Sequence, residues 1–194
     1  MDSLEVKKPL VGSMLPDLEL PALCDNKITT LRLADFKKKW LVLFFYPADF
    51  TFVCPTELQE LAELYPEFKK INTEIVSVST DTAYSHKAWR EISPAIQKVT
   101  FPMAADSAGV LTKYLGIYIE SEGMALRGTF IVSPEGIIKA MEVNDNSIGR
   151  SGKELLRKVQ AAQYTAEHKH EVCPASWQPG TKTLTKSDAL VGKI

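Results

Sequence analysis

Of the three cysteines in the chain, Cys24, Cys54 and Cys173, the second has the sequence context best suited to chemistry. It follows an apolar run (residues 40–46) and a short loop, and Pro55 comes directly after it. Proline is well accepted in the first turn of a helix, so we expect Cys54 at a helix N-terminus. The helix dipole and a nearby cation would both favour the thiolate there, and the thiolate is the reactive form of cysteine.

Two further residues are candidates to assist a reactive Cys54. Thr51 stands three positions earlier in the same loop, where a turned backbone would let its hydroxyl bond to an oxygen under attack. Arg127 enters an apolar segment, and a buried arginine needs an anionic partner, for which Cys54 and Glu57 are both available. Taken singly, a cysteine beside a core strand is usually a small buried apolar residue. The combination on one strand–loop–helix unit is what favours a reactive site.

The elements that must position these residues predict an α/β fold. Residues 40–46 (WLVLFFY) form a continuous apolar run, typical of a strand buried on both faces of a sheet. Residues 55–70 repeat apolar side chains every three to four positions and predict a helix, whereas residues 74–79 alternate and predict a strand. We also expect short strands at 18–20 and 28–31, a helix at 83–92 capped by Asp81, a hairpin of 129–133 with 137–143, and a helix at 152–168. This order predicts a mixed sheet covered by helices.

Length and composition fit a single domain with an appended tail. We expect a domain over residues 1–165 and an extended C-terminal arm over 166–194, where the chain becomes polar and is interrupted by Pro and Gly. The net charge of −1, with scattered Lys and Arg, gives no reason to expect nucleic acid as a partner. The first ten residues lack the apolar core of a signal peptide, and no apolar run is long enough to cross a membrane. We therefore expect a soluble, cytoplasmic protein with no membrane partner.

The segment YPADFTFVCPTEL, residues 46–58, resembles the active-site segment of typical 2-Cys peroxiredoxins of the alkyl hydroperoxide reductase C and thioredoxin peroxidase type. The family pattern Pro-x-x-x-Thr-x-x-Cys is matched here by Pro47, Thr51 and Cys54. Arg127, within ALRGTF, matches the family's catalytic arginine. Further matches, in supporting positions around the active site and in the segment HEVCPASWQPG, are Glu57, Trp89, Arg150 and Cys173. The resemblance runs from about residue 9 to residue 185.

The resemblance implies a thioredoxin-like, three-layer fold and an antioxidant enzyme that reduces hydrogen peroxide and organic hydroperoxides. Cys54 would be the peroxidatic residue and become a sulfenic acid, while Thr51 and Arg127 orient the peroxide and Pro47 shields the sulfur. Cys173 of a second protomer would act as the resolving cysteine and form a Cys54–Cys173 disulfide. A thioredoxin-like protein or a flavoprotein would reduce that disulfide. The residues alone leave pairing within one chain open.

The resemblance implies no metal and no bound cofactor, and it implies a homodimer, with a decamer as a larger possibility. Some family members carry a Gly-Gly-Leu-Gly loop and a C-terminal Tyr-Phe pair that favour overoxidation. Here the corresponding segments read SPAIQK (residues 93–98) and DALVGKI (residues 188–194), so we expect resistance to sulfinic acid formation. Cys24 has no assigned role, and we interpret it as a spectator thiol.

Three other functions compete with the peroxidase interpretation. A disulfide oxidoreductase of thioredoxin type needs a Cys-x-x-Cys pair, which Cys54 lacks because Glu57 occupies the fourth position. His168, His170 and Cys173 are metal-ligand types at close spacing, but only three lie together and the segment matches the resolving-cysteine region. A holdase chaperone activity would add to peroxidase activity, and the sequence does not decide it.

Overall fold

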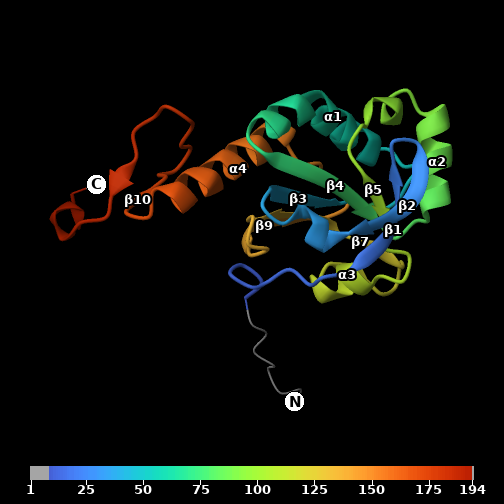
Figure 1. The fold of residues 1–194 in the computed structure, drawn as a ribbon, viewed down its shortest axis with the longest axis horizontal. Helices are drawn as coiled ribbons and strands as arrows, with labels where there is room; N and C mark the ends of the chain where they lie inside the picture. The colour runs from blue at the N-terminus through green and yellow to red at the C-terminus, as the bar shows by residue number, and fades with distance from the viewer. Residues whose placement is uncertain (1–8, 194) are drawn as a thin grey trace, which may run out of the picture. The chain divides into compact units, whose positions relative to one another are not determined.

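The structure is a computed structural model, and it describes residues 9–193. These residues form two compact units that divide between Arg150 and Ser151. The first unit contains a seven-stranded sheet in the order β2-β1-β5-β4-β3-β8-β9 (Figure 1). The domain division predicted from the sequence, 1–165 and 166–194, stays a prediction.

Parallel and antiparallel pairs are both present, so the sheet is mixed, as predicted. The central strand β3 pairs in parallel with β4 and antiparallel with β8, and β4 pairs in parallel with β5. All six residues of β3 are buried, which confirms the expectation of a strand covered on both faces. The strand bounds are β1 Glu19–Cys24, β2 Lys27–Arg32, β3 Trp40–Phe45, β4 Thr73–Ser79, β5 Met103–Ala105, β8 Arg127–Val132 and β9 Ile138–Asn144.

Helices cover both faces of the sheet, which gives the three layers of the α/β fold predicted from the sequence (Figure 1). Alternate residues of β3, namely Leu41, Leu43 and Phe45, join a buried apolar cluster with Leu111 and Leu115 around the short helix α3. Helices α1 and α3 lie on opposite sides of the sheet in Figure 1. The helix bounds in this unit are α1 Cys54–Lys70, α2 Ala83–Ile92 and α3 Val110–Tyr114.

The first unit also differs from the sequence prediction in two places. The side chain that caps α2 is Thr82, whose Oγ1 accepts a hydrogen bond from the Ser85 N–H at 3.2 Å, and not Asp81. The Asp81 carboxylate instead accepts hydrogen bonds from Ser79 and from the backbone of Asp49. The sequence pattern predicts no elements over residues 99–126, yet they hold β5, α3 and a two-stranded ribbon of β6 (Tyr118–Ile119) and β7 (Met124–Ala125).

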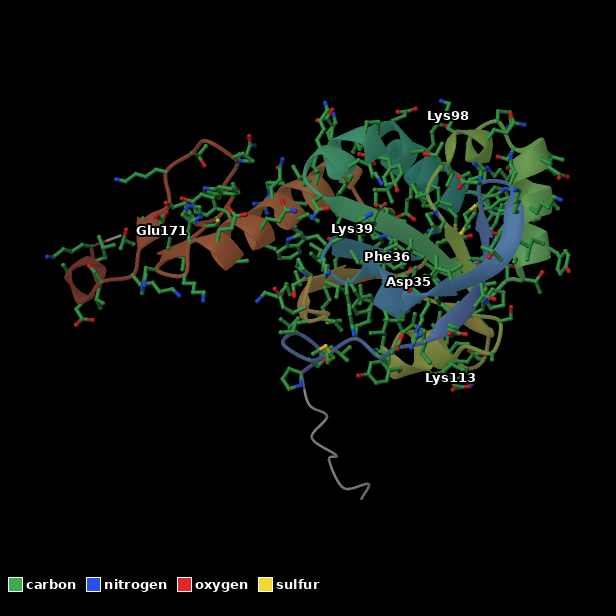
Figure 2. The ribbon with its side chains drawn as sticks, in the orientation of Figure 1. Asp35, Phe36, Lys39, Lys98, Lys113 and Glu171 are labelled. Atoms are coloured by element: carbon green, nitrogen blue, oxygen red, sulfur yellow. The ribbon has the colours of Figure 1, made fainter. Side chains whose placement is uncertain are left out.

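The second unit consists of one long helix and a short hairpin. Helix α4 covers Gly152–Glu167, one residue shorter than predicted, and Ser151 caps it by accepting a bond from the Glu154 N–H. The segment predicted to be extended contains the antiparallel pair β10 (Glu171–Val172) and β11 (Leu184–Thr185). Glu171, labelled in Figure 2, accepts hydrogen bonds from Tyr164 and Thr183 and fastens the hairpin to the helix end. Within residues 9–193, no helix is both long and apolar enough to span a bilayer.

Candidate active site

The first residue of α1 is Cys54, and its side chain is fully buried. The chain leaves the carboxyl end of β3 at Phe45, forms a loop over residues 46–53, and starts the helix directly after it. Pro55 stands at the N-terminus of the helix, and Glu57 lies in its first turn, as the dipole favours. The predicted location of Cys54 at a helix N-terminus is therefore the observed one.

Arg127 reaches Cys54 because β8 runs antiparallel to β3, which brings the start of β8 to the edge of the sheet where β3 ends. Its Nη1 lies 3.4 Å from the Cys54 Sγ and 2.8 Å from Oε2 of Glu57. Its Nε and Nη2 both donate to the carbonyl oxygen of Asn146, at 2.9 and 2.8 Å. The guanidinium is thus held in one orientation while one nitrogen faces the sulfur.

Glu57 joins Arg127 to a second buried arginine. Arg150 donates to Oε1 of Glu57 from its backbone N–H at 2.7 Å and from Nε at 2.9 Å. Its Nη1 donates to the carbonyl of Gly128 and to Thr129, and its guanidinium carbon lies 3.4 Å from the centre of the Phe44 ring. Burial lowers the pKa of Arg150, and the contacts with Glu57 oppose that effect.

The three buried ionic residues of this cluster carry a net positive charge. Arg127 and Arg150 contribute two positive charges, Glu57 contributes one negative charge, and all three side chains are buried. A thiolate on Cys54 neutralises the remaining charge, and unpaired charge is costly in a buried site. The cluster is chemically suited to hold an anionic sulfur and to stabilise negative charge that develops beside it.

The loop before Cys54 carries the other predicted site residues. Pro47 is buried, and Thr51 is partly buried with its Oγ1 donating to the Ala48 carbonyl at 2.9 Å. The hydroxyl predicted to face the sulfur therefore bonds within the loop in this structure. Trp89 of α2 packs behind the loop, with its ring centre 6.0 Å from that of Tyr46 and 6.0 Å from that of Phe50.

A polar network that the sequence interpretation missed lies beneath the same loop. The carboxylate of Asp49 accepts a bond from the Tyr46 hydroxyl at 2.8 Å and lies 2.8 Å from Nδ1 of His86. The side chains of Asp49 and His86 are fully buried. A histidine three positions before Trp89, on the apolar face of α2, was the available signal, because a buried polar residue requires partners.

The other two cysteines have different surroundings. Cys173 belongs to the second unit, where it is partly buried with its Sγ 3.9 Å from the Ala161 carbonyl, and burial raises its pKa against the effect of Arg157. Cys24 ends β1, and burial together with Asp25 raises its pKa. No disulfide joins the three described cysteines, and residues 9–193 contain no group of three or more His, Cys, Asp or Glu side chains placed to hold a metal ion.

Known proteins provide an independent comparison. A sequence model of the AhpC/TSA family matches residues 11–141, and a model described as the C-terminal domain of 1-Cys peroxiredoxin matches residues 161–193. Alkyl hydroperoxide reductase C of Pseudomonas aeruginosa is 47% identical over 185 residues, which are 95% of this chain and 99% of that protein. The corresponding protein of Escherichia coli K12 is 45% identical over the same shares.

Solved structures agree with the sequence comparisons. Enterococcus faecalis AhpC superposes with a TM-score of 0.84 at 47% identity, covering 86% of this chain and all of that chain. Reduced 2-Cys peroxiredoxin of Plasmodium vivax superposes with a TM-score of 0.89 at 32% identity, covering 94% of this chain and 96% of the other.

Proposed function

Because this chain belongs to the AhpC/TSA family and is a thiol-dependent peroxidase, we propose that Cys54 is the residue with which it reduces hydrogen peroxide and organic hydroperoxides. One observation carries the assignment of the nucleophile. Cys54 is the cysteine whose sulfur lies against a buried guanidinium, in a cluster whose other three ionic groups leave one positive charge.

The first chemical step is an attack of the Cys54 thiolate on one oxygen of the peroxide. The S–O bond forms, the O–O bond breaks, and the leaving oxygen takes up a proton and departs as water or an alcohol. Cys54 becomes a sulfenic acid, the reversible stage of cysteine oxidation. The proposed role of Arg127 is to stabilise the negative charge that moves onto the peroxide oxygens. Thr51 orients the peroxide and Pro47 shields the sulfur, while Glu57, Arg150 and Trp89 support the site.

The second step restores the enzyme through Cys173. The Cys173 sulfur displaces water from the Cys54 sulfenic acid and forms a disulfide, between the two protomers of a homodimer or of a decamer of dimers. Because Cys54 is fully buried at the start of α1, the first turn of the helix must open before a second sulfur can reach it. A thioredoxin-like or flavoprotein reductant then supplies two electrons to the disulfide, and we place this cycle in the cytoplasm.

Non-reducing peptide mapping after one equivalent of hydrogen peroxide tests this function. The expected product is a cross-linked Cys54–Cys173 peptide from a chain that migrates as a dimer. A Cys54 sulfenic or sulfinic acid beside a free Cys173 would keep the peroxidase and remove the resolving role. An unmodified Cys54 thiol would contradict its assignment as the nucleophile.

A further inference from the structure

The loop over residues 46–53 needs an anchor outside itself. Phe50 adopts a left-handed backbone with φ of 57°, a conformation that residues other than glycine disfavour. The bond from Thr51 to Ala48 closes one turn within the loop but does not attach the loop to the rest of the molecule. Peroxide reduction as proposed above depends on where this loop places Pro47 and Thr51, so the inference rests on that proposed function.

Asp49 supplies the attachment through both its side chain and its backbone. Its carboxylate meets the hydroxyl of Tyr46, the first and fully buried residue of the loop, and Nδ1 of His86 on α2, each at 2.8 Å. Its backbone N–H donates to Oδ2 of Asp81, also at 2.8 Å, in the segment that follows β4. Two attachments outside the loop, His86 on α2 and Asp81 after β4, therefore converge on one loop residue that has no exposed side-chain surface.

The positions of the protons in this network follow from the acceptors that surround His86. Its Nε2 lies 3.2 Å from the carbonyl oxygen of Ala104 on β5, and a carbonyl can only accept, so Nε2 carries a proton. Its Nδ1 lies 2.8 Å from Oδ2 of Asp49, a hydrogen-bond distance between two fully buried side chains. Burial and the Asp49 carboxylate raise the pKa of Tyr46 well above its ordinary value, so its hydroxyl stays a donor.

We propose that Asp49 and His86 are positioning residues, which hold the loop in the conformation that Cys54 needs to react with a peroxide. They act through the loop, whereas Arg127 acts on the sulfur directly. Weakening the pair is expected to slow the oxidation of Cys54 while the ionisation of its thiol stays the same. A small displacement of groups around a reacting atom can lower a rate by two orders of magnitude.

A pair of substitutions at Asp49 separates this role from general destabilisation. In Asp49→Ala the loop loses its bonds to Tyr46 and His86. In Asp49→Asn the amide oxygen still accepts from Tyr46, and the amide nitrogen donates to Nδ1 of a neutral His86 that keeps its Nε2 proton for Ala104. We expect the second-order rate constant for oxidation by hydrogen peroxide to fall about tenfold to 100-fold in Asp49→Ala, and Asp49→Asn to recover most of that loss.

The experiment uses the full-length reduced protein in stopped-flow oxidation, with alkylation of Cys54 by iodoacetamide across pH as the companion readout. The alkylation midpoint is expected to be the same in the wild type and both variants. Should Asp49→Ala fail to fold, His86→Phe takes its place, because it keeps a ring in the same buried space and removes the bond to Asp49. In the wild type, the imidazole ¹⁵N spectrum is expected to show a proton on Nε2 of His86.

Four results would overturn the inference: wild-type oxidation rates in Asp49→Ala, an Asp49→Asn variant as slow as Asp49→Ala, a shifted alkylation midpoint, or an unprotonated Nε2. If Asp49→Ala does not fold, a wild-type oxidation rate in His86→Phe overturns it in the same way. A wild-type chain whose Cys54 does not react with peroxide would instead overturn the proposed function. The two failures are therefore distinguishable in one set of measurements.

Discussion

Arg127 makes four hydrogen bonds with its three guanidinium nitrogens, and this geometry cannot be reproduced by a point charge. Two of the bonds go to the carbonyl of Asn146 and fix the plane of the group. The third bond pairs the guanidinium with the Glu57 carboxylate, and the fourth is to the Cys54 sulfur. Orientation and charge are thus supplied by different atoms of one side chain, and they can be separated by substitution.

We predict that Arg127→Lys slows oxidation of Cys54 by roughly 10-fold to 100-fold, because a lysine keeps the charge but cannot bond to Asn146 and the sulfur together. Arg127→Gln also removes the positive charge and is expected to slow the oxidation of Cys54 by a further factor of about ten. The rate is measured by competition with a second peroxidase. Arg32→Lys is the matched control, because Arg32 forms an exposed pair with Asp17. Equal rates for Arg127→Lys and the wild type would contradict the prediction.

Cys24 is expected to contribute little to turnover. Its thiol is half-buried, and burial and the neighbouring Asp25 raise its pKa, so the fraction present as reactive thiolate is small. We predict that Cys24→Ser changes steady-state peroxide turnover by less than about twofold, whereas Cys54→Ser abolishes it. A tenfold loss in Cys24→Ser, measured in the same coupled assay, would show that the thiol has a role.

Some residues of the site can be recognised from a short segment of sequence, whereas others depend on partners far away along the chain. Cys54, Pro47 and Thr51 lie within eight positions of one another, and a local pattern was enough to find them. Cys54 and Glu57 were both offered as anionic partners of Arg127 because a buried arginine needs an anion, and Arg127 contacts both. Asp49 and His86, by contrast, are 37 positions apart, and their bond depends on how α2 packs. A sequence shows that His86 is polar but does not show which partner satisfies it.

At the scale of elements, the long and strongly patterned segments were predicted closely, the short strands expected at 18–20 and 28–31 are β1 and β2, and the elements between residues 99 and 126 were missed. The helix expected at 55–70 is α1, and the strand expected at 74–79 is β4. Strand β5 has three residues and helix α3 has five. Segments this short cannot show the spacing of apolar residues, every second position in a strand or every 3.6 in a helix, on which the prediction depends. These elements form because tertiary contacts with the sheet stabilise them.

One ionic cluster ties α1 to the sheet and should make stability depend on pH. Burial would raise the pKa of Glu74 on β4, but hydrogen bonds from Lys39, Lys69 and Tyr65 outweigh it and lower the pKa to about 2. Lys39, labelled in Figure 2, precedes β3, and Lys69 lies in the last turn of α1. A carboxylate with a lowered folded-state pKa stabilises the fold above its unfolded pKa of about 4.3, and the contribution disappears as the pH falls toward 2.

We predict that Glu74→Gln lowers the free energy of unfolding by about 1–2 kcal/mol at pH 7. This value is smaller than the lowered pKa of Glu74 alone would give, because both lysines are half-exposed and solvent screens their charges. The difference from the wild type should shrink between about pH 4.5 and pH 2. Urea denaturation at about pH 7, 4 and 2.5 measures it. The matched control is Glu67→Gln, which removes an exposed pair with Lys70 and should change stability by less than about 0.5 kcal/mol. A difference that stays constant with pH would contradict the assignment.

At the scale of the whole molecule, we expect the balance between disulfide formation and further oxidation of Cys54 to depend on how easily α1 opens, because its buried sulfur must first become accessible. Helix α2 ends at Ile92 and is followed by a short 3-10 turn at Ile96–Lys98, and the described C-terminal residues include a single turn at Asp188–Leu190. With no Gly-Gly-Leu-Gly loop and no Tyr-Phe pair, we predict that Cys54 resists sulfinic acid formation. Intact-protein mass spectrometry during turnover at about 1 mM peroxide tests this, and rapid gain of a stable adduct of about 32 Da on Cys54 would contradict it.

The pairing of Cys54 with Cys173 that we propose involves two protomers, and complementation tests it more directly than any single variant. A Cys54→Ser chain retains Cys173, and a Cys173→Ser chain retains Cys54, so neither variant alone can form the proposed disulfide. If pairing is between protomers, a mixed dimer contains one intact Cys54–Cys173 pair, because each chain supplies the residue that the other lacks. If pairing is within a chain, no mixed dimer can contain an intact pair.

We predict that unfolding and refolding the two variants together restores disulfide formation in the mixed dimers, which make up about half of a statistical mixture. A different affinity tag on each chain isolates these dimers in two successive steps. Peptide mapping after one equivalent of peroxide should then join Cys54 of the Cys173→Ser chain to Cys173 of the Cys54→Ser chain. The control is the same mixture without refolding, in which protomers have not exchanged and little cross-link should form. Isolated mixed dimers that form no such peptide would exclude the disulfide between protomers, while the wild-type chain would still show whether Cys54 and Cys173 pair at all.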